Sequence, residues 1–435
     1  MTRQPKTGDY VEVTTSDETI TGILLESPEL EKDVVIVKLD SGYNTGIDEK
    51  KVRKISLLPQ PKIKTGKEKL TKKISSGKKL PKITILHTGG TIASKVDYRT
   101  GSVYSSFKPE DLLELFPELG GIARFDSVFI RNMWSDDLRF KHFELIAKAI
   151  EKEAKKGADG IIIGIGTDNL AVAAAAMSFI VESSPMPILF VGAQRSSDRG
   201  SSDAAMNLVC AAAFIAKTDF RGVAICMHEN VSDNDCVILP ACKTAKLHTS
   251  RRDAFRPVNA KPIARVNYDT KDVTVITKYE KKSGKLVIKP RMEEKIGLLK
   301  IHINMQPEQF EFYKGYKGLV LEGTGLGHTP GQAPDEASKI HKKIYPAIKA
   351  VIDSGCVVVM ASQCLYGRVQ MRVYDKGRDL TALGVIPGED MLPNTAFVKL
   401  AWLLANCKKE EVKQLIGKNL RGEISDRTEE QAFLN

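Results

Sequence analysis

The sequence predicts an α/β protein in which a small all-β barrel precedes a two-domain body built on parallel sheets. From Lys82 onward, β-branched runs alternate with helical stretches, and this alternation is typical of a parallel sheet covered on both faces. Before residue 60, short segments of alternating polarity are separated by turn residues, which favours a small barrel. With 435 residues, the chain is also long for a single domain.

Changes in composition divide the chain into five segments. Residues 1–60 form the small barrel, and residues 61–81 form a lysine-rich linker that cannot bury enough apolar surface to fold alone. Residues 82–258 form the first α/β domain, which carries the expected active site. Residues 259–294 are polar and irregular, so we expect a connector, and residues 295–435 form the second α/β domain.

The expected elements follow from hydrophobic periodicity. In the small module we expect strands at residues 8–13, 19–25, 34–39 and 51–58, with turns at residues 40–42 and 44–46. In the first α/β domain we expect strands at residues 83–86, 127–130, 160–165, 188–191 and 222–227, and helices at residues 140–155, 169–181 and 202–216. In the second we expect strands at residues 296–301, 318–321 and 357–360, and helices at residues 333–354 and 395–406.

The basic character of the chain is concentrated in one segment. The net charge is +11, yet residues 62–82 hold nine lysines against a single acidic residue, Glu68, and so account for most of it. A run of this kind is commonly a solvated linker. The alternative is an arm that attracts phosphates, because lysines near RNA release its counterions. The sequence leaves both interpretations open.

Composition also bounds the location of the protein. No apolar run reaches the roughly 18 residues of a membrane span, and the first residues lack the apolar stretch of a signal peptide. The seven cysteines make no CxxC pair, which favours reduced thiols over a disulfide frame or a zinc site. We therefore expect a cytoplasmic protein that has no membrane partner and itself binds no cofactor or metal.

Two threonine loops carry the expected chemistry. Residues Thr88–Ala93 and Gly166–Asn169 each follow a β-branched run and precede a helical stretch, so both belong at the carboxyl edge of a sheet, where open α/β sheets bind ligands. In the first loop, the glycines allow close backbone approach, and Thr91 precedes free N–H groups that favour a developing oxyanion. A phosphate loop or a merely structural glycine turn are the alternatives, although GxxxxGK[ST] is absent.

The second loop offers a hydroxyl beside a carboxylate, Thr167 and Asp168. In isolation this pair is also an ordinary helix N-cap. For catalysis a base is needed, and the only histidine near either loop is His87, which we expect at the end of a strand. A lysine can act as the base when burial lowers its pKa, but residue chemistry alone does not say which lysine does so.

These loops match the signatures of a known family. Thr88–Ala93 corresponds to TGGTIA and Gly166–Asp168 to GTD, so the chain from about residue 82 to 435 resembles the bacterial-type L-asparaginase family. Further segments agree with this resemblance: Gly192–Arg195 with Asp203, Glu322–Gly325, and Pro393–Ala396.

The resemblance implies a fold and a set of catalytic roles. The body would be asparaginase-like, with Thr91 as the nucleophile or its immediate partner at a side-chain amide. The segment Thr244–Lys246 resembles the family's lysine segment, which selects Lys246 as the base. Lys246 would take a proton through Thr167, while Asp168 orients the lysine and balances its charge.

The resemblance also implies residues that hold the substrate. Ser135 and Asp136 correspond to the position that binds the α-amino acid head of the substrate, although many members have glutamine where Asp136 stands. Tyr98 corresponds to a tyrosine on a mobile loop that covers the substrate. Members of the family commonly form homodimers, so we expect a homodimeric core within any larger assembly.

The first eighty residues point to a narrower group, because ordinary asparaginases lack them. A small barrel, a basic linker and the run Thr249–Phe255 resemble the D-subunit family of archaeal glutamyl-tRNA(Gln) amidotransferases. This resemblance implies that the chain is the amidohydrolase subunit of a ligase complex. The subunit would hydrolyse glutamine to glutamate and ammonia. The ammonia would pass to a partner, the E-subunit, which binds misacylated tRNA(Gln) and activates its glutamate with ATP and Mg. The barrel and linker would dock on the partner or the tRNA.

Two other functions remain possible from the residues alone. The first is a free-standing L-asparaginase or glutaminase with an appended domain. The second is a non-enzymatic binding module on an inactive amidohydrolase scaffold, which the presence of Thr91, Thr167, Asp168 and Lys246 disfavours.

Overall fold

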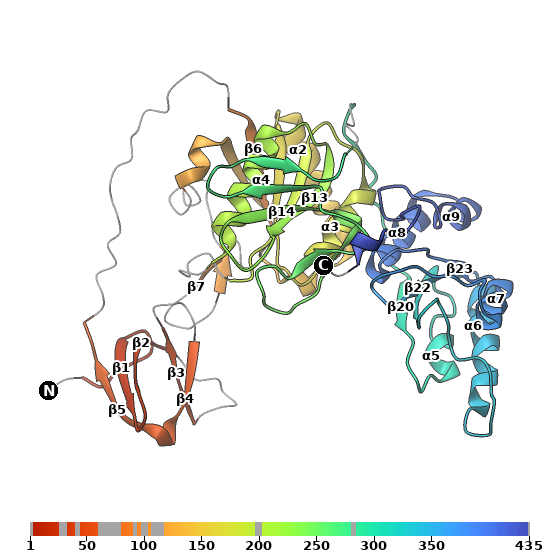
Figure 1. Ribbon diagram of the computed structural model, residues 1–435, viewed down its shortest axis with the longest axis horizontal. Coiled ribbons are helices and arrows are strands. Elements are labelled where there is room, and N and C mark those ends of the chain that lie inside the picture. The colour runs from red at the N-terminus through yellow and green to blue at the C-terminus, as the bar shows by residue number, and fades with distance from the viewer. Residues whose placement is uncertain are drawn as a thin grey trace.

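The computed structural model describes residues 3–25, 33–39, 44–59, 80–89, 94–96, 103–105, 117–195, 202–279 and 284–433. Figure 1 shows three parts in chain order: an amino-terminal sheet, a first lobe around a large sheet, and a second lobe around a smaller one. Within the described residues, no helix is both long and apolar enough to span a bilayer.

The amino-terminal sheet is antiparallel, with the strand order β4-β3-β2-β1-β5. Its strands are β1 (Tyr10–Thr15), β2 (Thr19–Leu25), β3 (Val34–Lys38), β4 (Asn44–Asp48) and β5 (Val52–Leu57). A small core of Val11, Val13, Val37 and Ile47 fills one face. The expected turn at residues 44–46 is instead the start of β4, because pairing with β3 places Ile47 in this core. In the described residues, β4 and β5 are the edges of the sheet.

The first lobe is built on eight strands in the order β18-β17-β14-β13-β12-β10-β6-β9. Five of them are parallel: β6 (Lys82–His87), β9 (Arg124–Phe129), β10 (Gly160–Gly164), β12 (Pro187–Val191) and β13 (Gly222–His228). Three antiparallel strands extend this sheet: β14 (Asp235–Pro240), β17 (Ala264–Asn267) and β18 (Val273–Val275). Residues 259–294, expected to be an irregular connector, therefore contribute two strands to the first sheet.

Helices cover both faces of this sheet, as the alternation of elements predicts. The helices are α2 (Phe140–Lys155), α3 (Leu170–Ile180) and α4 (Ala204–Lys217). Successive residues of β10 point to opposite faces, so Ile161 and Ile163 pack with α2 and α3, while Ile162 packs with α4. The alanine-rich sequence of α3 lets this helix approach the sheet closely, and it is buried along most of its length.

Short paired segments complete the first lobe. These are β7 (Ser94–Val96) with β8 (Val103–Ser105), β11 (Val181–Ser183) with β19 (Val287–Ile288), and β15 (Thr244–Lys246) with β16 (Phe255–Pro257). The last of these pairs carries the lysine selected by the sequence.

The second lobe has a parallel sheet in the order β20-β21-β22-β23. Its elements are β20 (Ile296–Lys300), α5 (Pro307–Glu311), β21 (Gly318–Gly323), α6 (Ile344–Asp353), β22 (Val357–Ser362), α7 (Asp375–Leu383), β23 (Ile386–Pro387), α8 (Pro393–Asn406) and α9 (Lys409–Leu415). The helix expected from residue 333 starts later. Oδ1 of Asp335 accepts a hydrogen bond from the N–H of Ser338, and this local turn competes with helix formation.

Helix α8 joins the two lobes, because it packs on α3 of the first lobe and on β20 and β21 of the second. Its Trp402 contacts Phe179 of α3, with the ring centroids 6.1 Å apart. One continuous apolar cluster therefore includes residues from both sheets, such as Ile188 and Val320. The lobes share this core, and each lobe also has an apolar cluster of its own.

His87 ends β6 inside the first lobe, at the strand end where we expected it. Its side chain is buried, and neither ring nitrogen has a hydrogen-bond partner among the described residues. Burial disfavours the charged imidazolium and lowers the pKa of His87 from 6.5 to about 4.

This burial makes stability depend on pH. Below pH 6.5 the unfolded chain binds a proton at residue 87 that the folded chain does not bind until about pH 4. The free energy of unfolding should therefore fall on acidification, by about 2 kcal/mol from this residue at pH 5. Urea unfolding of wild type and His87→Leu at pH 7 and pH 5 measures the effect. The variant should lose less stability than wild type over this range, and equal losses would contradict the assignment.

Candidate active site

The two threonine loops start side by side at the carboxyl edge of the first sheet. Strands β6 and β10 are parallel neighbours, and His87 stands opposite Gly164 at their ends. Both the backbone N–H and the Oγ1 hydroxyl of Thr88 donate to the carbonyl oxygen of Gly164, each at 3.1 Å. Because β9 and β10 lie on opposite sides of β6, this edge is also a switch point of the topology, where α/β sheets bind ligands.

The start of the first loop needs glycine. Gly89 has a φ of 104°, and a Cβ atom there would lie 2.5 Å from the carbonyl oxygen of Met133 and 2.6 Å from its nitrogen. The N–H of Met133 in turn donates to the carbonyl oxygen of Thr88 at 3.2 Å. Two of the expected site residues, Thr91 and Tyr98, lie outside the described residues.

The second loop meets the lysine of β15. Nζ of Lys246 is 2.9 Å from Oγ1 of Thr167 and donates a hydrogen bond to it, and it is 2.8 Å from Oδ1 of Asp168. The lysine side chain is 14% exposed and the aspartate side chain 69% exposed, so the ion pair lies at the mouth of the site. The hydroxyl of Thr167 can thus relay a proton to the amine when the lysine is neutral.

The position of Lys246 is set by strand pairing. In the β15–β16 hairpin, Lys246 stands opposite Phe255, whose ring is fully buried. The N–H of Leu247 donates to the carbonyl oxygen of Ala254 at 2.7 Å and closes the next position of the hairpin. The lysine therefore extends from an anchored strand toward the loop after β10.

Asp168 is not the helix cap that its sequence position also permits. The N-cap of α3 is Asn169, while the carboxylate of Asp168 binds Lys246. Ser135 fixes the start of this helix instead. Its Oγ accepts a hydrogen bond from the N–H of Asn169 at 3.2 Å, and its carbonyl oxygen accepts one from Nδ2 of Asn169 at 2.9 Å. Asp136 follows in the same turn and is exposed.

A cavity of about 260 Å³ opens beside Asp168 and Lys246, between the two lobes. Three residues of the second lobe that were not predicted as site residues also line this cavity: Glu322, Asn394 and Thr395. Each stands in a segment that resembles the asparaginase family, and this resemblance could have identified them. Gly192 closes the other side of Thr167, because a Cβ atom at residue 192 would lie 2.9 Å from Cγ2 of that threonine.

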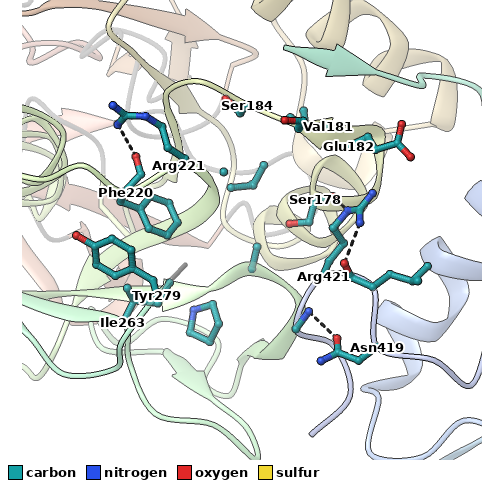
Figure 2. Close-up of a pocket in the computed structure, with 17 residues that line it drawn as sticks. Ser178, Val181, Glu182, Ser184, Phe220, Arg221, Ile263, Tyr279, Asn419 and Arg421 are labelled. Carbon is teal, nitrogen blue, oxygen red and sulfur yellow. Dashed lines mark hydrogen bonds between the residues drawn. The ribbon is translucent and has the colours of Figure 1, made fainter. Parts of the chain in front are cut away.

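A larger cavity of about 530 Å³ lies at the opposite end of α3 (Figure 2). Its two arginines donate to backbone carbonyl oxygens, Arg221 to Phe220 at 2.9 Å and Arg421 to Ser178 at 3.0 Å. None of the expected site residues is among those that line it. The chemistry that the sequence predicts therefore belongs to the smaller cavity.

Among the described residues, no group of three or more histidine, cysteine, aspartate or glutamate side chains could hold a metal ion. The groups that the site brings together are the hydroxyl of Thr167, the amine of Lys246 and the carboxylate of Asp168. An amine linked to a hydroxyl at a sheet edge suits proton removal from a second hydroxyl during attack on a carbonyl carbon.

Curated relatives match this chain over nearly its whole length. It is 43% identical over 436 residues to the glutamyl-tRNA(Gln) amidotransferase D-subunit of Pyrococcus furiosus, and the match covers 98% of this chain and 97% of the relative. The protein of the same name from Methanococcus maripaludis is 42% identical, with 96% and 98% covered. The chain belongs to the glutamyl-tRNA(Gln) amidotransferase D-subunit family. The sequence-based assignment to this family is confirmed.

Three family models match successive parts of the chain. The GatD N-terminal domain matches residues 6–58, which hold the amino-terminal sheet. The N-terminal asparaginase model matches residues 82–281, and the glutaminase/asparaginase C-terminal domain matches residues 295–416. Within this D-subunit architecture, the hydrogen-bonded set of Thr167, Asp168 and Lys246 lies in the N-terminal asparaginase part.

Solved structures confirm the asparaginase-like fold. The thermostable L-asparaginase of Thermococcus kodakarensis superposes with a TM-score of 0.70 and 28% identity, covering 80% of this chain and 100% of that protein. L-asparaginase I of Vibrio cholerae superposes with a TM-score of 0.67 and the same identity and coverage.

The glycine after Thr88 offers a test of the first loop. Gly89→Ala should lower the free energy of unfolding by more than the roughly 1–2 kcal/mol that a left-handed backbone alone costs, because the new methyl group meets the backbone of Met133. Gly157→Ala is the matched control, with a φ of 80° and open space around the added atom. Urea unfolding compares the two variants. Equal losses would show that the contact with Met133 does not constrain this loop.

Proposed function

We propose that this chain is the glutaminase subunit of a tRNA-dependent amidotransferase. It hydrolyses glutamine to glutamate and ammonia, and the ammonia passes to a partner subunit that converts Glu-tRNA(Gln) to Gln-tRNA(Gln) using ATP. The observation that supports this most directly is the hydrogen-bonded set of Thr167, Asp168 and Lys246 beside the Thr88 loop. Relatives named as glutamyl-tRNA(Gln) amidotransferase D-subunits also match this chain over nearly its whole length.

The proposed reaction assigns one role to each group. Oγ of Thr91 attacks the side-chain amide carbon of glutamine, and its proton passes through the hydroxyl of Thr167 to neutral Lys246. The carbon–nitrogen bond then breaks, and the amide nitrogen takes that proton and leaves as ammonia. Water hydrolyses the resulting ester, which releases glutamate and restores Thr91. Asp168 keeps the lysine in place, as its 2.8 Å contact supports.

Substrate binding is assigned to Ser135, Asp136 and Tyr98. Ser135 and Asp136 lie in one turn beside the start of α3, next to Asp168. We propose that the exposed carboxylate of Asp136 binds the α-amino group of glutamine, because their charges are opposite. Ser135 contributes by fixing the backbone of this turn, because its hydroxyl already accepts the N–H of Asn169. Tyr98 is assigned to covering the bound substrate.

The partners of the complex follow from the same proposal. The E-subunit supplies the site for ATP and Mg and the contact with tRNA(Gln), while this chain forms a homodimer within the larger assembly in the cytoplasm. The amino-terminal sheet and the lysine-rich segment after it dock on the partner or the tRNA. The match of residues 6–58 to a domain model of the D-subunit family supports a role specific to that assembly.

A free-standing asparaginase is the second candidate, and the match to the enzyme from Thermococcus kodakarensis favours it. That enzyme covers 80% of this chain. The amino-terminal sheet therefore distinguishes the candidates. An asparaginase needs no partner, whereas a glutaminase subunit should release ammonia chiefly when assembled with its partner and Glu-tRNA(Gln).

The test measures amidation of Glu-tRNA(Gln) by the assembled complex with glutamine, asparagine or free ammonia as nitrogen donor. Wild type should use glutamine and ammonia. Thr91→Val should abolish glutamine-dependent amidation and retain ammonia-dependent amidation, because the amidating centre lies on the partner. Loss of both activities would contradict this division. Rapid asparagine hydrolysis by the isolated chain, without any requirement for partner or tRNA, would favour the second candidate.

A second variant tests the base. Lys246→Ala should lower glutamine hydrolysis by about 10²- to 10⁴-fold, the range expected for loss of a general base. Lys246→Arg keeps the positive charge beside Asp168 but cannot give up its proton in the working range of pH. It should therefore be as inactive as the alanine variant. Activity in the arginine variant close to that of wild type would show that residue 246 acts through its charge alone.

A further inference from the structure

A buried ion pair stands directly before the strand that carries Lys246. Lys243 precedes β15, and its Nζ is 2.5 Å from Oδ2 of Asp390 in the second lobe. The same nitrogen donates to the carbonyl oxygen of Asp390 at 3.1 Å. The two side chains are 1% and 0% exposed. The pair thus links the two lobes, and Lys243 precedes the proposed base, Lys246, by three residues.

The surroundings hold this pair in one geometry. Oδ1 of Asp390 accepts the N–H of Ser425 at 3.0 Å, so both carboxylate oxygens are engaged. Burial lowers the pKa of Lys243, and the carboxylate of Asp390 opposes that shift. A charge placed this deep is tolerated only while its partner stays within reach. A small displacement of either chain segment is therefore costly.

The residue before Lys243 is held by the second lobe as well. The carbonyl oxygen of Cys242 accepts the Oγ1 hydroxyl of Thr395 at 3.0 Å. Thr395 lies in the first turn of α8 and lines the cavity beside Lys246. Two successive residues of the chain that enters β15 are thus fixed by the segment 390–395.

From these contacts we infer that Lys243 and Asp390 are positioning residues for the relay. Their ion pair fixes the start of β15 and so sets the reach of Lys246 to Thr167 and Asp168. Neither residue touches the substrate. The inference rests on the proposed glutaminase function, and it makes the geometry of the base depend on the second lobe.

The distance between the two lysines makes this coupling effective. A strand rises by about 3.3 Å per residue, so Lys246 follows Lys243 by about 10 Å of extended chain. Within that span, the hydroxyl of Thr244 donates to the carbonyl oxygen of Pro240 at 2.7 Å, which restrains the strand further. A displacement at Lys243 is therefore passed on to Lys246, and a shift of about 1 Å in a reacting group can cost about 10²-fold in rate.

The first variant is Asp390→Asn. An asparagine at this position can supply one oxygen to Lys243 or to Ser425 but not to both, so it breaks one arm of the anchor without changing the size of the side chain. Glutamine hydrolysis by the assembled complex should show a kcat lower by about 10- to 100-fold, with KM within about twofold. A lower kcat at nearly unchanged KM would show that the variant affects the relay rather than substrate binding.

The matched control is Glu423→Gln. Lys399 and Glu423 form another fully buried ion pair, 2.6 Å apart, whose further hydrogen bonds go to the backbone of residues 416–421. This variant should lose comparable thermal stability and keep its kcat. Lys243→Arg retains the charge and the ion pair, and it should keep most of the activity that Asp390→Asn loses.

Each outcome decides the inference. A lowered kcat in Asp390→Asn with kcat preserved in Lys243→Arg and Glu423→Gln supports it. An equal fall in kcat for Asp390→Asn and Glu423→Gln at equal stability, or an unchanged kcat in a folded Asp390→Asn variant, overturns it. If the wild-type complex itself hydrolyses no glutamine, the proposed function fails. The positioning role is then refuted as well. If the wild-type complex is active, a negative result with the variants refutes only the role of the ion pair.

Discussion

The site depends on the parallel pairing of β6 with β10. These strands are buried neighbours, and their register ends both at the same level, with His87 opposite Gly164. Both threonine loops start from this edge. Thr88 donates twice to Gly164, and Thr167 follows within one loop of the same strand end. A slip of one residue would exchange the two buried faces of β10, moving Ile162 from the side of α4 to the side of α2 and α3, so the packing of both faces also fixes the site.

Lys246, the proposed base, reaches this edge from a distant part of the sequence. Lys246 contacts Thr167 across 79 residues of sequence. The segment before its strand is bound to the second lobe through Cys242 and Lys243, and Thr244 binds the end of β14 in the first sheet. In the proposed relay, the end of β10 positions the hydroxyl, whereas contacts from both lobes position the amine. Helix α8 joins these lobes, because it packs on α3 and on the second sheet together.

Periodic sequence signals predicted the fold well where packing is regular. Helix α2 has the expected bounds because one apolar face meets the sheet, and the buried strands stand out as β-branched runs. The expectation failed at residues 333–338, where the side chain of Asp335 forms a local turn, and at residues 44–46, where pairing with β3 prevails over turn residues. Both failures come from hydrogen bonds that a hydrophobic pattern does not reveal. The paired threonine loops were predictable, since parallel strands end at one edge.

The lysine could not be selected by residue chemistry among the 65 basic residues of the chain, and only the family resemblance singled it out. The reason is physical. A lysine becomes a base through its distance from a hydroxyl, and that distance is set by contacts from distant segments, with Asp390 lying 147 residues from Lys243.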